Sequence, residues 1–321
     1  MDFKIIIYFI KFNLIYLYNS IFSFFYKINF FFQKKKIKIT FCKILKLSLT
    51  DIKILKKINN NKYEKYNLSY LKKKSKQKDL FIDIGAHYGF YTINLLSSFE
   101  KIYCFEPNKK SFDILKLNLQ TKRKVKLYNY LIGKKNQNIN FLSSKNSFIS
   151  QVDGKGVISE ELKYFVENIY TTEKKNFLKI YNFFYKKMIS NNFYLVYIHV
   201  FFYLFKNRYK FSQKKISKII NLLFRYLKFN DRYFCTKQKA ISKKIDYIFK
   251  KKKYPKTLMK IDVEGFEREV IEGAKKFIIN NHPDIFCEIG ENQIRIIKML
   301  QKLGYSMSKL DWKSYYFVYK K

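Results

Sequence analysis

Two glycines follow the first clearly patterned stretch of the chain, DLFIDIGAHYGFYT at residues 79–92. An apolar run there contains Asp83, and Gly85 and Gly89 come next, four residues apart. Glycine turns after strands let the backbone approach a nucleotide closely. The dinucleotide fingerprint G-x-G-x-x-G is missing, and a P-loop would need a lysine where this chain reads GFYT. Two interpretations remain: a site for a nucleotide without a phosphate tail, such as S-adenosylmethionine, or a plain tight turn.

An acid at the end of the next apolar run sharpens the first interpretation. Glu106 ends the run KIYCFE, 21 residues after Gly85. An acid at about this distance accepts hydrogen bonds from ribose hydroxyls in nucleotide-binding folds, whereas the alternative is a surface glutamate before a proline turn. We therefore expect a cofactor with a free ribose diol. In this interpretation Gly85 gives room to the adenosyl group, and Asp83 faces the ammonium end of the cofactor.

A third motif, KIDVEGFEREVIEGA at residues 260–274, gathers charges in a region that keeps its acids. Residues 257–291 hold eight of the 24 acids of the chain. Lys260, Asp262 and Glu264 alternate at the end of an apolar run, so we expect their side chains on one face of a strand. The charge preference of a helix N-terminus does not explain an acid inside an apolar strand.

The elements that carry these motifs alternate between strand and helix. We predict strands over 80–85, 101–107, 124–133, 257–265 and 282–290, helices over 91–99, 109–120, 266–281 and 293–305, and a closing hairpin over 306–310 and 314–320. This alternation predicts a parallel sheet. Ligands bind such sheets at the carboxyl ends of strands where the strand order reverses. Gly85 and Asp262 are therefore expected side by side, although 177 residues separate them.

The motifs FIDIGAHYGFYT, CFEPN, NYLIG, LMKIDVEGFEREVIEGA and HPDIFCEIGEN occur in this order, and the chain thereby resembles the FkbM-type family of S-adenosylmethionine-dependent methyltransferases. The resemblance covers about 79–150 and 240–310, and its KIDVEGFE block is quite specific. It implies the α/β fold of class I methyltransferases, which is Rossmann-like. That fold is a seven-stranded, mostly parallel sheet with one antiparallel strand and helices on both faces. It also implies methyl transfer to a hydroxyl of a sugar, a glycan or a small metabolite.

The resemblance also assigns roles to the motif residues. Those expected to bind the cofactor S-adenosylmethionine are Asp83, Gly85, Ala86, His87, Gly89, Glu106, Pro107 and Asn108. Those expected to bind the acceptor are Lys260, Glu267 and Glu288. No metal is expected at the site.

A hydroxyl is a poor nucleophile unless a base accepts its proton. Asp262 is the first candidate for this base and Glu264 the second. His87 is the third, because the pKa of histidine suits the task. His87 stands where the family often has asparagine, and a histidine beside a glycine turn also serves simply in packing or hydrogen bonding.

Composition divides the chain into four parts. Residues 1–78 are apolar and basic, 79–156 and 241–321 are the two halves of the methyltransferase domain, and 157–240 form a basic, aromatic insertion predicted to be helical. For 1–33 three interpretations remain: an interfacial segment on a membrane, a helix packed on the domain, or a membrane anchor.

An uncharged run at 188–205 is long enough to span a membrane. A single crossing there would place the two halves of one sheet on opposite sides of the bilayer. We therefore interpret the run as part of the inserted helical subdomain.

The net charge of +42, from 66 Lys and Arg against 24 Asp and Glu, points to nucleic acid or an anionic membrane surface as a partner. Drift toward A/T-rich codons explains the same composition, since Gly (9) and Pro (3) are rare. Base methylation is excluded, because none of the three prolines stands in the motifs that it uses. RNA ribose methylation stays an alternative, with Lys260, Asp262 and Glu288 as its site.

Two further expectations concern location and activity. The four cysteines form no CxxC pair, which is typical of reduced thiols in the cytoplasm. We expect a cytoplasmic protein, or one at the inner face of the membrane, that acts on a sugar or small-molecule acceptor. A non-catalytic methyltransferase fold on a membrane surface is the remaining alternative.

Overall fold

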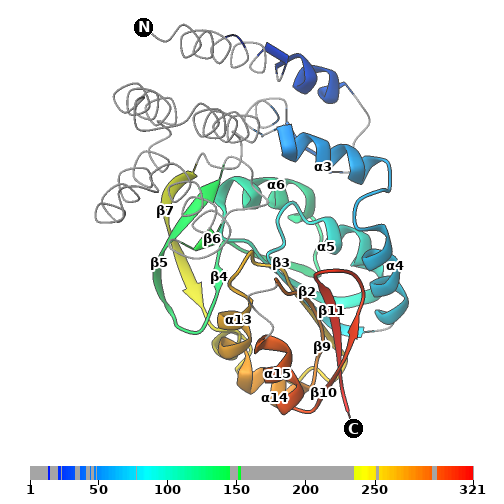
Figure 1. Cartoon of the computed structure of the whole chain (residues 1–321), viewed down its shortest axis with the longest axis vertical. Helices are drawn as coiled ribbons and strands as arrows, with labels where there is room; N and C mark the ends of the chain where they lie inside the picture. Colours follow the sequence, from blue (N-terminus) through cyan, green and yellow to red (C-terminus); the bar gives the residue numbers. More distant parts are fainter. Residues whose placement is uncertain are drawn as a thin grey trace, which may run out of the picture.

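The computed structural model in Figure 1 describes residues 14, 21–22, 24–32, 37–40, 44, 47, 49–76, 78–144, 151–152, 235–250, 253–290 and 295–320. Within these ranges a seven-stranded sheet forms the centre of the protein, and a four-stranded sheet lies beside it. Residues 157–234 of the predicted insertion and the apolar run 188–205 lie outside the described ranges. Within the described ranges, no helix is both long enough and apolar enough to cross a membrane.

The large sheet has the order β10-β11-β9-β8-β1-β2-β3. Its strands are β10 (Tyr305–Lys309), β11 (Ser314–Tyr319), β9 (Asp284–Glu288), β8 (Thr257–Ile261), β1 (Lys78–Ile84), β2 (Phe99–Phe105) and β3 (Val125–Tyr128). All neighbours pair in parallel except β11, which is antiparallel to both β9 and β10. This confirms the predicted class I methyltransferase fold, with its one antiparallel strand and the closing hairpin.

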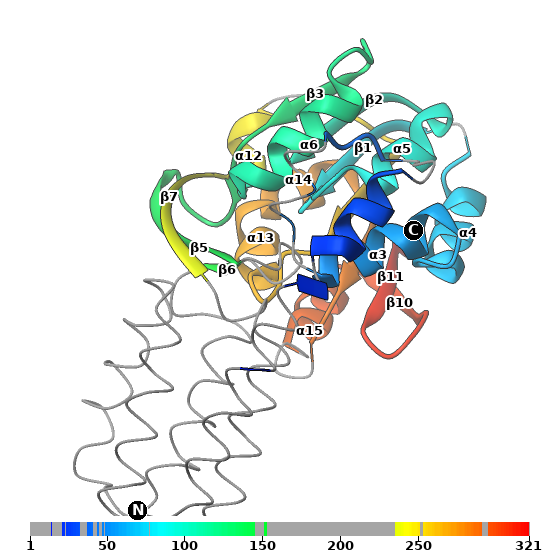
Figure 2. The same cartoon turned by 90° about the horizontal axis from the view of Figure 1, so that it is seen from above.

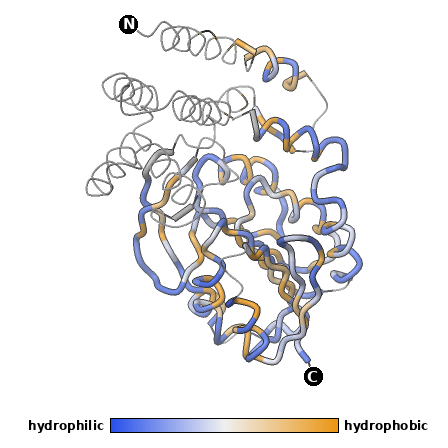
Figure 3. The backbone as a smooth tube through the Cα atoms, in the orientation of Figure 1, coloured by the Kyte–Doolittle hydropathy of each residue, from blue (hydrophilic) through white to orange (hydrophobic). Residues whose placement is uncertain are grey.

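Helices cover both faces of the large sheet, and its strands are therefore buried on both sides (Figures 1 and 2). One face packs on α4 (Lys65–Lys74), α5 (Phe90–Leu95) and α6 (Lys109–Leu119). The other face packs on α12 (Ile245–Ile248), α13 (Glu267–Gly273), α14 (Lys275–Asn281) and α15 (Arg295–Lys302). Along β1, Leu80 and Ile82 face the second group and Phe81 the first, as the period of two in a strand requires. Figure 3 shows the resulting apolar centre.

The N-terminal part packs on this domain. Helix α3 (Leu49–Asn59) and the described residues before it form a third apolar cluster, which reaches the domain through Tyr88 and Ile114. Phe30 is buried in that cluster, whereas Phe25 and Phe32 are exposed. The described N-terminal residues of this cluster, Phe30 among them, thus pack against the domain.

Three elements differ from the sequence prediction. The strand predicted over 124–133 divides into β3 and β4 (Leu131–Ile132), because the Asn129 side chain donates to the carbonyl oxygens of Glu106 and Pro107 and turns the chain away. Strand β4 then joins the small sheet β4-β7-β5-β6, built with β7 (Cys235–Lys243), β5 (Gln137–Ser144) and β6 (Gln151–Val152). The end of the predicted insertion, 235–240, therefore lies in a strand.

The third difference is a break in the helix predicted over 266–281. It separates into α13 and α14 around Ala274. The Asp246 carboxylate accepts from the backbone N–H groups of Lys276 and Phe277 in the first turn of α14. An acid at that position satisfies free N–H groups and suits the helix dipole, so it stabilises a new helix start.

The ends of β1 and β8 come into backbone contact at Gly85. Gly85 has a left-handed φ of +77°, and a Cβ built on it would lie 1.8 Å from the carbonyl oxygen of Asp262. We predicted Gly85 to give room to an adenosyl group, but in the structure the hydrogen in place of a side chain gives room to this strand-to-strand contact. Glycine is thus required by the fold itself.

Gly85→Ala is expected to lower the free energy of unfolding by more than about 2 kcal/mol, because it adds both backbone strain and a clash with a backbone atom. Gly290→Ala is the matched control, since no described atom lies within 4 Å of its added Cβ. Urea unfolding of both variants measures the difference. Equal stability of the two variants would contradict the close approach.

Candidate active site

One cavity opens at the carboxyl ends of the strands where the strand order reverses, between β1 and β8. It has a volume of about 920 Å³, including its mouth. Its floor comes from the turn after β1, the end of β2 and the turn after β8, and apolar side chains form one wall. The predicted site residues that line it are Gly85, Ala86, His87, Glu106, Pro107, Lys260, Asp262 and Glu264. The sequence thus predicted eight of the residues that line this cavity, and they come from three separate segments of the chain.

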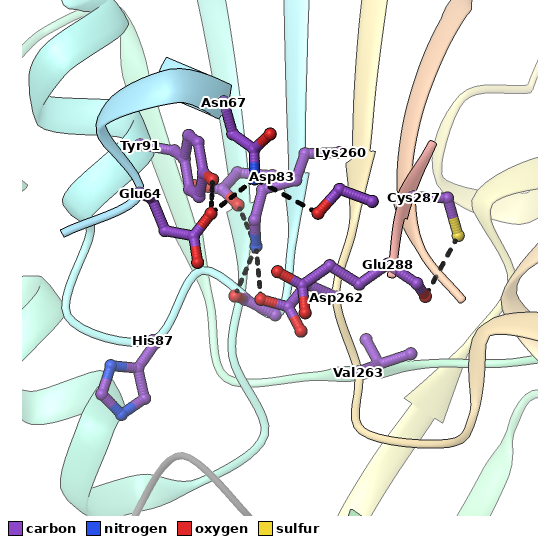
Figure 4. A network of polar contacts seen from close by, with 12 residues as sticks. Glu64, Asn67, Asp83, His87, Tyr91, Lys260, Asp262, Val263, Cys287 and Glu288 are labelled. Atoms are coloured by element: carbon purple, nitrogen blue, oxygen red, sulfur yellow. Dashed lines mark hydrogen bonds and ion pairs between the residues drawn. The ribbon is translucent and has the colours of Figure 1, made fainter. Parts of the chain in front are cut away.

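The Lys260 ammonium group lies at the centre of a polar network (Figure 4). It donates to the carbonyl oxygen of Gly85 at 3.0 Å and lies 3.3 Å from Asp83 Oδ1 and 3.6 Å from Asp262 Oδ2. Only 2% of Lys260 is exposed. Burial lowers the pKa of Lys260, but the carboxylates of Asp83 and Asp262 outweigh burial and raise it above its usual value. Lys260 is therefore charged at the site.

Asp83 is used inside the protein. It is fully buried, and its Oδ2 accepts from the Thr92 hydroxyl at 2.7 Å while Oδ1 faces Lys260. It does not line the cavity. In the described structure Asp83 therefore faces Lys260, and not the position expected for a cofactor ammonium group.

Glu106 presents a buried carboxylate to the cavity. Its Oε2 accepts from the backbone N–H of His87 at 2.9 Å and its Oε1 from that of Asn108 at 2.8 Å. These bonds fix the carboxylate between two turns, while each oxygen keeps a further lone pair. Burial raises the pKa of Glu106 to about 7, although both N–H groups act to lower it.

Asp262 and Glu264 follow the end of β8. Asp262 is partly exposed to the cavity, and its backbone N–H donates to the carbonyl oxygen of Ile84. Glu264 has a left-handed φ of 50°. Burial, followed by Asp262 and Glu288, raises the pKa of Glu264 above its usual value. Because β8 ends at Ile261, the predicted alternation along one strand is wrong, yet both acids still reach the cavity.

Three other predicted residues have structural roles and do not line the cavity. Glu267 Oε1 accepts from the backbone N–H groups of Val263 and Gly265 and so fixes the turn that carries the two acids. Asn108 is the N-cap of α6, where its side chain accepts from the backbone N–H of Lys110. Gly89, in left-handed conformation, gives room to Leu115 of α6. These three residues stand in the motifs because they hold the turns and helices around the cavity in place.

Glu288 lies at the end of β9, beside the cavity. Its carboxylate pairs with the Lys313 ammonium group on the turn between β10 and β11. Burial and then Asp262 raise the pKa of Glu288 to about 8, although Lys313 lowers it. Lys260, Asp262 and Glu288 are thus brought together, as the sequence predicted for the RNA alternative.

His87 lines the cavity but lies apart from the carboxylates in Figure 4. Its ring packs against Tyr88, with 3.7 Å between the ring centres. Burial and then Lys260 lower the pKa of His87, so it is neutral at neutral pH. In this position the side chain packs in the turn, on the other side of the cavity from Glu288.

The segment between α3 and α4 also contributes to the cavity, and no sequence motif pointed to it. Tyr63 lines the cavity and packs edge-on against Phe90. Glu64 Oε2 accepts from Asn67 Nδ2 at 2.6 Å and from the hydroxyl of Tyr91, a second lining residue, at 3.3 Å. One signal was present: Glu64 is the only acid between Asp51 and Asp79.

The strand order and the cavity at its reversal define a class I methyltransferase fold. Residues 207–307 match the family described as the methyltransferase FkbM domain, and the match includes the turn of Asp262 but not that of Gly85. The match covers 101 of the 321 residues, and this part of the chain therefore resembles the methyltransferase FkbM domain. No curated protein sequence matches the chain.

Two solved structures resemble the chain at low similarity. The methyltransferase FkbM of Methylobacillus flagellatus is 11% identical with a TM-score of 0.39, covering 85% of this chain and 56% of its own. A Pyrococcus horikoshii protein assigned as an RNA methyltransferase is 11% identical with a TM-score of 0.29, covering 92% and 97%. The chain thus spans little more than half of the Methylobacillus protein. The fold assignment rests on the strand order.

The raised pKa values of Glu106 and Glu288, about 7 and about 8, predict a loss of stability as the pH rises. From pH 4.5 upward these two groups bind more protons in the folded protein than in the unfolded chain, so their contribution to stability is largest in acid and is lost as the pH rises through these pKa values. The free energy of unfolding of the cofactor-free protein should fall by roughly 1–3 kcal/mol per group between pH 5 and pH 8.5. Urea unfolding across this range measures the slope, and Glu106→Gln should flatten it. An unchanged slope in that variant would contradict the assigned cause.

Proposed function

We propose that this protein is an S-adenosylmethionine-dependent methyltransferase that acts on a hydroxyl of a sugar, a glycan or a small metabolite. The observation that carries the proposal is that two carboxylates from different strand ends line one cavity. Glu106 at the end of β2 suits a ribose diol, and Asp262 after β8 suits the acceptor hydroxyl. Both lie where the strand order of the sheet reverses.

The residues of the cavity fit this cofactor. Glu106 has acceptor capacity for two hydroxyl groups, and its backbone bonds hold it in place. The wall formed by Leu131, Ile132 and Phe141 offers an apolar surface for a planar base. The carboxylates on the other side suit a ligand with a positive charge. When bound, S-adenosylmethionine supplies an activated methyl group.

Asp262 is the candidate base with the best placement. It is partly exposed to the cavity and paired with an ammonium group, whereas burial raises the pKa of the Glu264 carboxyl. His87 lies apart from this group. Asp262 would orient the acceptor hydroxyl and receive its proton, which contributes about 10²–10⁴-fold in such reactions.

Lys260 would act on Asp262. Its ammonium group fixes the carboxylate at 3.6 Å and joins it to the Gly85 turn, so the cofactor side and the acceptor side share one rigid support. Methyl transfer needs the acceptor oxygen in line with the methyl group and its leaving atom. Orientation of this kind is worth up to about 7–11 kcal/mol in ideal cases.

RNA ribose methylation is the second candidate. The observation that favours it is the grouping of Lys260, Asp262 and Glu288, together with the net charge of +42. The carboxylates beside the cavity favour an acceptor without phosphate, because a phosphate near them would be repelled. We therefore place the sugar or small-molecule acceptor first.

Glu106→Ala is expected to abolish binding of S-adenosylmethionine, because it removes the acceptor of both ribose hydroxyls. Isothermal titration calorimetry with S-adenosylmethionine measures the affinity. Glu272→Gln, a substitution on the outer face of α13, is the control and should bind like the wild type. Unchanged affinity of the Glu106→Ala variant for S-adenosylmethionine would contradict the cofactor assignment.

Asp262→Asn should keep the affinity for S-adenosylmethionine within about twofold and lower turnover by about 10²–10⁴-fold, because an amide can still accept from Lys260 but cannot take a proton. Methyl-labelled S-adenosylmethionine, offered with extracted glycans and separately with RNA, measures turnover and the acceptor class together. Label in RNA alone would favour the second candidate. Binding without transfer to any acceptor would favour a non-catalytic protein.

A further inference from the structure

The ammonium group at the methionine end of the proposed cofactor needs an anionic partner in this cavity, and the partner predicted from the sequence is occupied. Asp83 is fully buried, bonded to Thr92 and paired with Lys260. If the cofactor assignment holds, another acceptor takes this role, and a carboxylate would be the strongest one.

The remaining carboxylates in the network divide by position. Asp262 and Glu264 follow β8, and Glu288 ends β9, so these three lie on the side assigned to the acceptor. Glu288 is also paired with Lys313, and Asp262 with Lys260. Each of these three carboxylates is therefore either paired with a lysine or assigned to the acceptor, and none is left for the ammonium group of the cofactor.

Glu64 is not itself among the residues that line the cavity, but it lies between two that are, Tyr63 before it in the chain and Tyr91 on the helix that begins directly after the glycine turn. Its Oε2 accepts from the hydroxyl of Tyr91, a residue of α5 that lines the cavity. The Lys260 ammonium group lies 5.4 Å from the centre of the same Tyr91 ring. Figure 4 shows Glu64 and Tyr91 together, next to Lys260. This is the side on which the methionine end is expected.

Hydrogen bonds on one oxygen fix the position of the Glu64 carboxylate. Asn67 fixes Oε2 at 2.6 Å, and the same Asn67 amide nitrogen donates to Asp311 at 2.8 Å, so the helix α4 and the β10–β11 turn hold it together. Within the described residues Oε1 has no hydrogen-bond donor, and Figure 4 shows it pointing away from Asn67 and Tyr91.

The backbone of Glu64 is in the left-handed region, with φ 45° and ψ 32°. This conformation is uncommon for a residue with a side chain, and such strain gathers at ligand sites. The preceding residue, Tyr63, lines the cavity, so the turn between α3 and α4 is part of its wall.

We propose that Glu64 binds the ammonium group of the cofactor's methionine end and that the α3–α4 turn is therefore part of the cofactor site. The inference rests on the proposed function. It assigns to the N-terminal segment a role in binding that the motifs of the two domain halves do not supply.

The test compares two ligands that differ in the methionine end. S-Adenosylhomocysteine carries the ammonium group, and 5′-methylthioadenosine lacks the whole amino-acid part. Glu64→Gln keeps the size of the side chain and its bonds to Asn67 and Tyr91 but removes the charge. Calorimetry should show a tenfold to hundredfold loss of affinity for S-adenosylhomocysteine. Affinity for 5′-methylthioadenosine should stay within about twofold, and Glu272→Gln should bind both ligands like the wild type.

Each outcome has a distinct meaning. An equal loss for both ligands overturns the proposal, because it assigns Glu64 a structural role only. Unchanged affinity for S-adenosylhomocysteine overturns it as well and leaves the proposed function intact. Failure of the wild type to bind either ligand contradicts the proposed function itself. Thermal unfolding of Glu64→Gln, together with its retained 5′-methylthioadenosine binding, shows whether the variant is folded.

Discussion

The Lys260 ammonium group is almost completely buried, and the arrangement of the site depends on how it is held. Removing a charge from water costs several kcal/mol unless partners replace the water, and taking away one partner of a buried pair costs about 3–5 kcal/mol. Here the partners are the Gly85 carbonyl oxygen, Asp83 and Asp262. Asp83 lies in β1 and pairs in register with Lys260 of β8, and Gly85 and Asp262 directly follow the ends of these two strands. The same ammonium group therefore fixes the register of β1 and β8 and the position of the candidate base.

The carboxylates around this ammonium group outnumber the cations. Among the described residues of the network there are five acids and two cations. The acids are Glu64, Asp83, Asp262, Glu264 and Glu288, and the cations are Lys260 and Lys313. The raised pKa values of Glu264 and Glu288 are the response of this crowded group to burial. A cationic ligand would relieve the repulsion. A protein with a net charge of +42 thus keeps an acidic site, which is a reason to separate the charge of the whole chain from the charge preference of its cavity.

The sequence predicted the large sheet well, because its strands are short apolar runs bounded by glycine or proline. It predicted Glu106, Lys260 and Asp262 in one cavity, since strand ends at a reversal must meet. It could not separate residues that line the cavity from those that shape it: Gly89 and Asn108 stand in the motif because α6 packs and begins there. It also could not place Glu64, because the segment that carries this acid has neither a glycine turn nor an alternating pattern.

The N-terminal segment is part of the cavity as well as of the core. Tyr88, in the glycine turn, is buried in the same apolar cluster as Ile52, Leu55 and Ile58 of α3. Ile58 also lines the cavity. The packing that attaches α3 to the domain thus acts on the turn that carries residues proposed to bind the cofactor. A composition rich in lysine and aromatic residues set this segment apart in the sequence, but Ile58 and Tyr63 make it part of the cavity wall.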